Sequence, residues 1–171
     1  HEGLLSFVKA LERSDELIRI TKYADPNLMI SEITDRFSKQ EKGSKALLFE
    51  NTGTEFPLLI NSMGSEKRMS IALSRESLLD VESEIEGLFA NLLLPKDNFW
   101  DKLKLLPRLK EISSWLPAKL KRRGACQEFI MDKPDLARLP VLKCWPADGG
   151  KFITLPCVHT VDPETKISNL G

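Results

Sequence analysis

The sequence predicts a mixed α/β (α+β) domain followed by the first strands of a second, β-rich domain. Two observations carry this prediction. Amphipathic helices alternate with short apolar strands up to residue 94, and beyond residue 124 the pattern becomes strand-like and rich in proline. A barrel or sandwich needs more strands than residues 125–171 can supply. We therefore expect the second domain to be incomplete.

The first three elements follow one another closely along the chain. The opening segment places five apolar side chains on one helical face: Leu4, Leu5, Phe7, Val8 and Leu11. Residues 16–21 alternate as a short strand. Residues 25–39 form a second helix, with Asp25 as its N-cap and Pro26 at its first position. The inward face of this helix carries Ile30, Ile33 and Phe37.

Two apolar strands and two further helices complete the first domain. The strands are expected at residues 45–51 and 56–62, joined by a short loop. Residues 64–73 open a helix that Ser65 caps. A longer amphipathic helix follows over residues 76–93. Its apolar stripe consists of Leu78, Val81, Ile85, Leu88, Phe89 and Leu92.

Residues 95–124 combine three prolines and two tryptophans with a local excess of positive charge. From residue 96 to residue 123 there are nine Lys or Arg and three Asp or Glu. We interpret this segment as a proline-interrupted basic connector that ends the first domain, so the domains are residues 1–124 and 125–171. The segment could lie on a membrane surface, but a solvated face packed against the second domain is the default interpretation.

The second domain is expected to begin with strands at residues 126–131 and 151–156. A hairpin then closes the chain over residues 157–171, with Pro163 at the second position of its turn. The expected register follows from a two-residue loop between the strands.

This register places Ser168 opposite His159 and Asn169 opposite Val158. Because side chains alternate along a strand, His159 and Asn169 should point to opposite faces. His159 is the only internal histidine. We interpret it as a structural or surface residue rather than a metal ligand.

Bulk composition argues against several classes of protein. The 25 Lys and Arg balance the 25 Asp and Glu, which argues against a dedicated nucleic-acid binder. The longest apolar runs are much shorter than the about 20 residues that span a bilayer. Cys126, Cys144 and Cys157 form no C-x-x-C pair, so a disulfide framework or structural zinc site is not expected. Reduced thiols in a cytoplasmic protein fit this pattern.

Asp148, Gly149 and Gly150 stand directly before one of the expected strands. Paired glycines permit positive φ and let the backbone approach a ligand closely. The pattern matches neither a dinucleotide-binding fingerprint nor a P-loop. Taken alone it predicts a tight turn, and the residues by themselves name no reaction.

The last 33 residues, LPVLKCWPADGGKFITLPCVHTVDPETKISNLG, closely resemble the UbiD family of decarboxylases. In that family a similar stretch leads into a flavin-binding split β-barrel of the flavin-reductase type. The segments DPNLMISEITDR, ALLFEN and FPLLINSMGSEKRMSIAL also resemble the family's N-terminal domain, so the likeness covers nearly the whole chain. The KCWP and FITLP variants look most like bacterial members tied to quinone biosynthesis.

The resemblance implies a non-oxidative decarboxylation of an aromatic acid, here a 4-hydroxybenzoate-type precursor of ubiquinone or menaquinone. It also implies prenylated FMN as cofactor, with a divalent metal, usually Mn²⁺, and K⁺ bridging its phosphate. The cofactor supplies the hard chemistry, and the protein supplies position and electrostatics. Further implied partners are a flavin prenyltransferase, the remainder of the polypeptide and, in the full-length protein, a second copy.

Four residues match family positions in the site. Asn169 matches an asparagine whose side-chain oxygen ligates the metal, and amide oxygens suit Mn²⁺ or Mg²⁺. Leu170 and Gly171 match backbone that continues along the cofactor, where a carbonyl can serve K⁺. Thr154 matches a threonine on a strand that lines the flavin site. Lys151 departs from the proline or small residue of that family position.

The family's catalytic arginine follows that asparagine, and its metal-binding His and catalytic glutamates come later. His159 precedes the asparagine and does not match the metal-binding histidine. We therefore expect no catalytic residue in this chain, and we predict that it neither binds prenylated FMN tightly nor decarboxylates a substrate by itself. Two alternatives stay open: a non-catalytic α/β binding or assembly module, and a related decarboxylase of aryl or phenolic acids. The expected location is the cytoplasm, with peripheral membrane contact left open.

Overall fold

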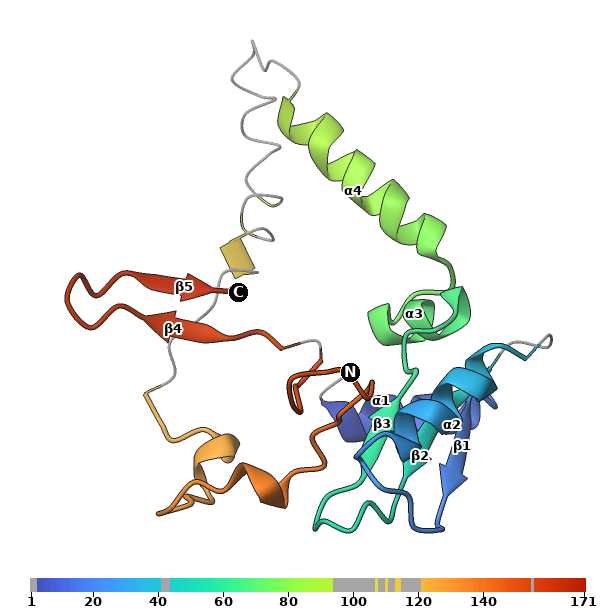
Figure 1. Ribbon diagram of the computed structural model, residues 1–171. Coiled ribbons are helices and arrows are strands. Elements are labelled where there is room, and N and C mark those ends of the chain that lie inside the picture. The colour runs from blue at the N-terminus through green and yellow to red at the C-terminus, as the bar shows by residue number, and fades with distance from the viewer. Residues whose placement is uncertain are drawn as a thin grey trace, which may run out of the picture. The chain divides into compact units, whose positions relative to one another are not determined.

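The computed structural model describes most of the chain, and its parts are shown in Figure 1. The described residues are 3–40, 44–93, 107, 110, 113–114, 121–154 and 156–171. Contacts divide the chain into two units, of which the first comprises His1–Leu78 and Asp135–Gly171 and the second Leu79–Pro134. Neither edge of the second unit falls at residue 124. The domain boundary at that residue stays a prediction. Most of the basic connector lies outside the described residues.

Helix α1 (Leu4–Arg13) forms where the apolar spacing predicts it. Its buried side chains are Phe7, Val8 and Leu11, whereas Leu4 and Leu5 are 65% and 78% exposed. The buried stripe is therefore narrower than predicted. Only one stripe of a helix can face the sheet that it packs against. Leu4 and Leu5, in the first turn of α1, lie outside the contact with the sheet.

A three-stranded mixed sheet forms the centre of the first unit. It has the order β1 (Leu17–Ile20), β2 (Ala46–Phe49) and β3 (Leu58–Ile60), with β1 parallel to β2 and β3 antiparallel to it. All four residues of β2 are buried. A strand with a neighbour on each edge and cover on both faces is a continuous apolar run rather than an alternating one, and this explains the sequence ALLF.

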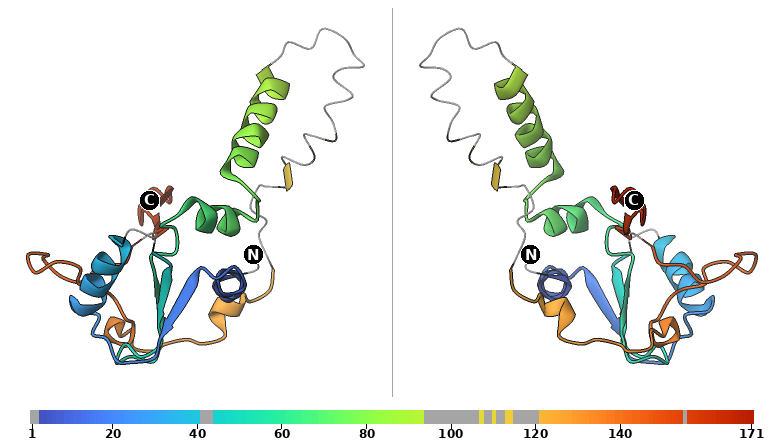
Figure 2. Two further views of the ribbon diagram at one scale, coloured as in Figure 1. Left: turned by 90° about the vertical axis from the view of Figure 1, so that its right-hand side faces the viewer. Right: turned by 90° about the vertical axis from the view of Figure 1, so that its left-hand side faces the viewer.

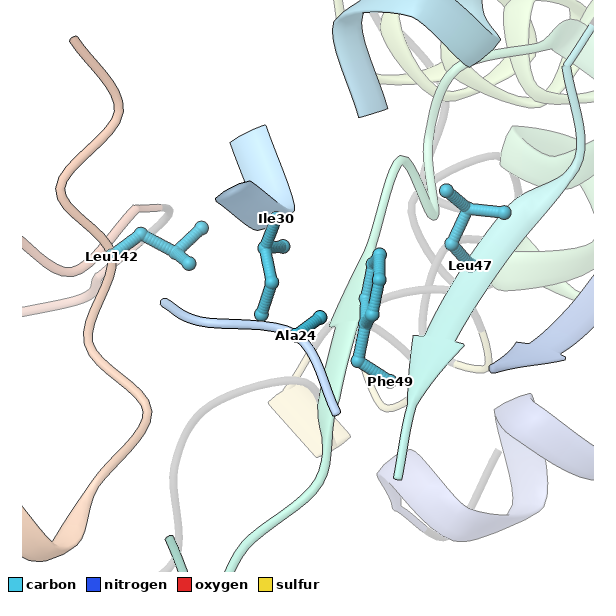
Figure 3. Packing of buried hydrophobic residues seen from close by; sticks show 5 residues of the cluster. All are labelled: Ala24, Ile30, Leu47, Phe49 and Leu142. Atoms are coloured by element: carbon cyan, nitrogen blue, oxygen red, sulfur yellow. The ribbon is translucent and has the colours of Figure 1, made fainter. Parts of the chain in front are cut away.

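Two apolar clusters occupy the two faces of this sheet. Figure 3 shows the larger one, which joins five residues from four separate segments: Ala24, Ile30, Leu47 and Phe49 of β2, and Leu142. The smaller cluster consists of Phe7, Leu11 and Ala46. Alternation along β2 sends successive side chains to opposite faces, so α1 and α2 cover different faces (Figure 2).

Helix α2 (Met29–Ser38) begins later than predicted. Leu28 is its N-cap, so the prediction of Asp25 as N-cap and Pro26 as first residue is wrong. The Asp25 carboxylate instead accepts the backbone N–H of Asn27 at 2.7 Å. Lys143, from the C-terminal segment, accepts the N–H of Leu28 at 3.0 Å. Asn27 and Lys143 thus form an isolated bridge, and Leu28 takes a left-handed φ of 71°, so the helix begins only at Met29.

Helices α3 (Glu66–Leu73) and α4 (Leu78–Leu93) both form as predicted, and the hydroxyl of Ser65 caps α3 by accepting the N–H of Arg68. Along α4, which belongs almost wholly to the second unit, Ile85 and Phe89 are 49% and 55% exposed. The predicted stripe of α4 is therefore only partly covered, and the side chain of Leu92 lies outside the described residues. No helix among the described residues is long and apolar enough to cross a membrane.

The two strands predicted at residues 126–131 and 151–156 do not form. Ala125–Gln127 is the 3₁₀ helix η1, and Phe152 makes only an isolated bridge with Leu142. A strand needs a hydrogen-bonded neighbour along its length, whereas the pairing of Phe152 with Leu142 is a single isolated bridge. The terminal hairpin, β4 (His159–Val161) and β5 (Ser168–Leu170), does form. A barrel is not seen in the described part of the chain.

Candidate functional site

Within the first unit, the segment that carries the candidate site residues is tied to the N-terminal part of the chain at three places. The 3₁₀ helix η2 (Leu136–Arg138) is held by an ion pair from Arg138 Nη2 to Glu55 Oε2 at 2.6 Å. Leu142 enters the larger apolar cluster, and Lys143 bridges to Asn27. Sequence reasoning missed these contacts, since nothing local signals a pairing across such separations.

The hairpin register differs from the predicted one. The observed pairs are His159↔Leu170, Thr160↔Asn169 and Val161↔Ser168. The prediction that Ser168 lies opposite His159 is therefore wrong by two residues. Because the shift is even, alternation still places His159 and Asn169 on opposite faces. Both side chains are exposed.

The longer loop has a physical cause in Asp162. Its carboxylate accepts the backbone N–H groups of Thr165 at 2.7 Å and Glu164 at 2.8 Å, and these bonds lower the pKa of Asp162. Lys166 then turns the chain with a φ of 60°, and the N–H of Asp162 reaches the carbonyl of Ile167 at 2.9 Å. An aspartate that binds the backbone two or three residues ahead favours this wider turn over a two-residue loop.

The backbone carbonyls of Leu170 and Gly171, at the end of β5, differ in their hydrogen bonding. Gly171 exchanges both backbone hydrogen bonds with Val158, at 2.8 and 3.1 Å. In an antiparallel ladder the next pair, His159 and Leu170, then turns its N–H and C=O groups away from the partner strand. The carbonyl of Leu170 is thus the better placed of the two for an external cation, since that of Gly171 already accepts a hydrogen bond.

Thr154 is exposed and lies in a bend rather than on the expected strand. It lines an apolar cavity of about 250 Å³. The other walls of this cavity are Leu58–Ile60, Leu139–Leu142, Phe152 and Ile153. A second apolar cavity of about 600 Å³ shares Phe152 and Ile153 with the first and carries Lys151 in its wall. The structure thus places Thr154 beside a concave apolar surface, on a different segment from Asn169.

The turn at Asp148 does not depend on the glycines that follow it. The Asp148 carboxylate accepts the N–H groups of Trp145 at 2.8 Å and Cys144 at 3.2 Å. Neither Gly149 nor Gly150 has a positive φ, so the expected use of that conformation is wrong. A Cβ added to either glycine would meet no atom within 4 Å. There is therefore room for a side chain at both positions.

The described residues do not make a metal site on their own. Among them, no three His, Cys, Asp or Glu side chains lie close enough to hold a metal ion. Asn169 supplies one neutral oxygen donor on an exposed strand, whereas divalent metals need several ligands. Cys144 and Cys157 are free, and the side chain of Cys126 lies outside the described part.

Two family models match successive parts of the chain. Residues 8–86 match the N-terminal domain of 3-octaprenyl-4-hydroxybenzoate carboxy-lyase, the UbiD enzyme. Residues 118–171 match the Rift-related domain of the same enzyme. The two matches therefore follow one another in the order that the family shows.

Relatives and solved structures agree with these matches. Over 172 aligned residues the chain is 44% identical to an uncharacterized protein of Aquifex aeolicus and 40% identical to one of Archaeoglobus fulgidus. It covers 35% and 34% of those proteins, about a third of their length. The fold is similar to that of the UbiD-class enzyme HmfF from Pelotomaculum thermopropionicum.

An evolved dimeric form of HmfF in complex with prFMN matches with a TM-score of 0.67 and 23% identity, over 99% of this chain and 34% of that one. The complex of HmfF with FMN gives 0.64 and 22%, over 97% and 32%. At these identities the structural match speaks for the fold.

Proposed function

Since this chain belongs to the UbiD carboxy-lyase family, we propose that it is the N-terminal part of a non-oxidative decarboxylase that uses prenylated FMN. The observation that carries the proposal is the succession of two matched family domains. Leu142 packs the second of them into the larger apolar cluster, and Lys143 pairs it with the residues before α2. Fold likeness alone would not suffice, because one fold hosts many functions. The two relatives that are 44% and 40% identical are uncharacterized, so the family assignment and not their identity supports the activity.

The proposed substrate is a 4-hydroxybenzoate-type precursor in quinone biosynthesis. The matched family is described by 3-octaprenyl-4-hydroxybenzoate, an aromatic acid with a long apolar tail. The apolar cavities beside Thr154 are compatible with such a ligand, since tails of this kind are held by apolar walls. Aryl or phenolic acids without a tail are the alternative substrates that the experiment below separates.

Prenylated FMN would supply the electron sink for decarboxylation. The residues of this chain would hold and orient it. Thr154 would line the flavin, and Asn169 would give its amide oxygen to a divalent metal, Mn²⁺ or another. The carbonyl of Leu170 would face K⁺, and Gly171 would continue the backbone along the cofactor. The bound prFMN and FMN of the structurally similar HmfF support the cofactor assignment.

The remaining ligands and the acid–base groups would come from other parts of the polypeptide. The chain spans about a third of its relatives, and its described residues supply a single candidate ligand, Asn169, to the metal. We therefore expect this chain alone to show neither tight flavin uptake nor CO₂ release. The complete protein would work in the cytoplasm as a homo-oligomer, with its cofactor made by a flavin prenyltransferase.

The test compares the 171-residue chain with a longer polypeptide that contains it, each produced together with a flavin prenyltransferase. Only the longer protein should copurify with flavin and release CO₂ from a 4-hydroxybenzoate. Substrates with and without a prenyl tail distinguish a quinone precursor from a simple phenolic acid. Stoichiometric, tight flavin uptake by the short chain would contradict the expected inactivity. A longer protein that holds no flavin would instead favour a binding or assembly module.

One pair of variants tests the site itself in the longer protein. Asn169→Ala should reduce retained flavin and metal by about tenfold or more. Its fold should be intact, because the side chain of Asn169 is exposed. Ser168→Ala is the matched control, since alternation places Ser168 on the other face of β5. Equal flavin content in the two variants would remove Asn169 from the site.

A further inference from the structure

The loop between β3 and α3 has features of an anion site that the proposed function does not use. Asn61 turns the chain out of β3 with a φ of 56°, and Ser65 caps the eight-residue helix α3. The N–H groups of Glu66 and Lys67 open the helix and have no intrahelical acceptor. A helix N-terminus after a glycine-containing loop attracts negative charge through these N–H groups and the helix dipole.

A buried arginine provides the second, independent observation. Arg68 is 1% exposed, and its Nη1 donates to Glu16 Oε2 at 3.0 Å and to the carbonyl of Ser44 at 2.5 Å. Its Nε and Nη2 are buried and have no hydrogen-bond partner among the described residues. Nε and Nη2 together form the side-on fork of a guanidinium, which is the edge that pairs with two oxygens of a phosphate or carboxylate.

This fork faces the loop that precedes the helix. Nη2 lies 2.7 Å from the position that a Cβ on Gly64 would take, and Asn61 Oδ1 lies 2.0 Å from the same position. Asn61 donates its amide Nδ2 to Ser44 Oγ and to the carbonyl of Lys45, but its Oδ1 makes no hydrogen bond with Arg68. An anion that displaces this oxygen would meet both the fork and the N–H groups at the start of α3.

We propose that the Asn61–Lys67 loop and the Nε–Nη2 fork of Arg68 bind a phosphate group, either as the free ion or on an organic ligand. A phosphate is favoured over a carboxylate because its tetrahedral oxygens can face the fork and the helix N–H groups from different directions, whereas the two oxygens of a carboxylate lie in one plane. Glu16 does not compete for the site, since Lys67 and Arg68 already engage its two oxygens. Glu66, exposed in the first turn, is the acidic side chain that opposes binding.

The test is a titration of the ¹⁵N-labelled chain with sodium phosphate and, separately, with phenyl phosphate, against sodium chloride at equal ionic strength. We expect saturable shifts of the amide signals of Ser62, Met63, Glu66 and Lys67 and of the Nε–H signal of Arg68, and none with chloride. Tighter binding of phenyl phosphate than of phosphate would identify a phosphate ester as the ligand. Equal shifts with chloride, or shifts located elsewhere, would overturn the proposal.

Two variants should change the phosphate affinity in opposite directions. Arg68→Lys keeps a charge but loses the fork, so phosphate binding should weaken by about tenfold. Glu66→Gln removes the opposing charge from an exposed position and should tighten binding by about twofold to fivefold. Arg138→Lys alters a surface ion pair elsewhere and should leave binding unchanged. If Arg68→Lys does not fold, an unchanged affinity of Glu66→Gln suffices to reject the site.

Discussion

The guanidinium of Arg68 and the carboxylate of Glu16 form an ion pair, with Nη1 and Oε2 3.0 Å apart and side chains that are 1% and 16% exposed. The pair joins the start of α3 to the residue before β1. The other carboxylate oxygen of Glu16, Oε1, lies 2.9 Å from Lys67 Nζ. A buried charge is tolerated only with a partner, so this contact helps to hold α3, whose Ile71 and Ala72 also pack against the smaller apolar cluster.

Replacing Glu16 by glutamine should lower the free energy of unfolding by about 3 kcal/mol, because it leaves a buried guanidinium without its counter-charge. Urea unfolding followed by circular dichroism measures the change. Glu32→Gln is the control, since the Glu32–Arg36 pair is exposed on α2 and should contribute within about 0.5 kcal/mol. Equal losses in the two variants would mean that the Glu16 pair does not support the fold.

The same pair should make stability depend on pH. Burial raises the pKa of Glu16, but hydrogen bonds from Lys67 and Arg68 outweigh it and hold that pKa below its ordinary value of 4.5. A lowered folded-state pKa stabilises the protein fully above the unfolded-state value, and this contribution is lost as the pH falls through the folded-state pKa. The difference in unfolding free energy between wild type and Glu16→Gln should therefore shrink below about pH 4.5. A constant difference down to pH 3 would contradict the linkage.

Two glycines should respond differently to alanine. A Cβ on Gly64 would lie 2.0 Å from Asn61 Oδ1, and Asn61 is tied to Ser44 and Lys45 by hydrogen bonds. Gly64→Ala should therefore cost about 1–2 kcal/mol of unfolding free energy, as those bonds must shift. Gly149→Ala should change it by less than about 0.5 kcal/mol, because its surroundings are open. Thermal unfolding of both variants checks the contrast, and a larger loss at residue 149 would refute it.

Lys166 occupies a left-handed position that suits glycine better. Its φ of 60° strains the backbone of a residue with a Cβ. Lys166→Gly should therefore stabilise the β4–β5 hairpin by about 0.5–1 kcal/mol. Slower hydrogen exchange of the Val158 and Asp162 amides, which donate within the hairpin, would report this.

The control for this prediction is Lys166→Ala. It also removes the contact from Lys166 Nζ to the carbonyl of Pro163 but keeps the Cβ. It should therefore not stabilise the hairpin. Stabilisation by alanine as well as glycine would show that the side-chain contact, rather than backbone strain, sets the exchange rate.

Much of the first unit could be predicted from local signals. The helices α1, α3 and α4 and the strands β1 to β3 form where apolar spacing and capping residues place them. Each depends on residues close in sequence, such as Ser65 bound to Arg68. The start of α2 could not be predicted, because the N–H of Leu28 donates to the carbonyl of Lys143, which is more than a hundred residues away in the sequence.

The candidate site was also predicted only in part from the sequence. The motif in residues 139–171 predicted the family, which the two matched domains confirm. It also predicted a hairpin that carries Asn169, although the roles of Asn169, Thr154, Leu170 and Gly171 stay predictions. The hairpin register was wrong, because the carboxylate of Asp162 binds two backbone N–H groups and widens the turn.

The sequence by itself determined most helices and strands of residues 1–93, the family and the faces of the hairpin, because these depend on spacing and on alternation along one segment. The tertiary structure alone decided which groups meet: Arg68 with Glu16, Lys143 with Asn27, and Arg138 with Glu55. The physical reason is that burial and pairing energies belong to contacts between distant segments. No local pattern of residues encodes which of several equivalent partners will be reached.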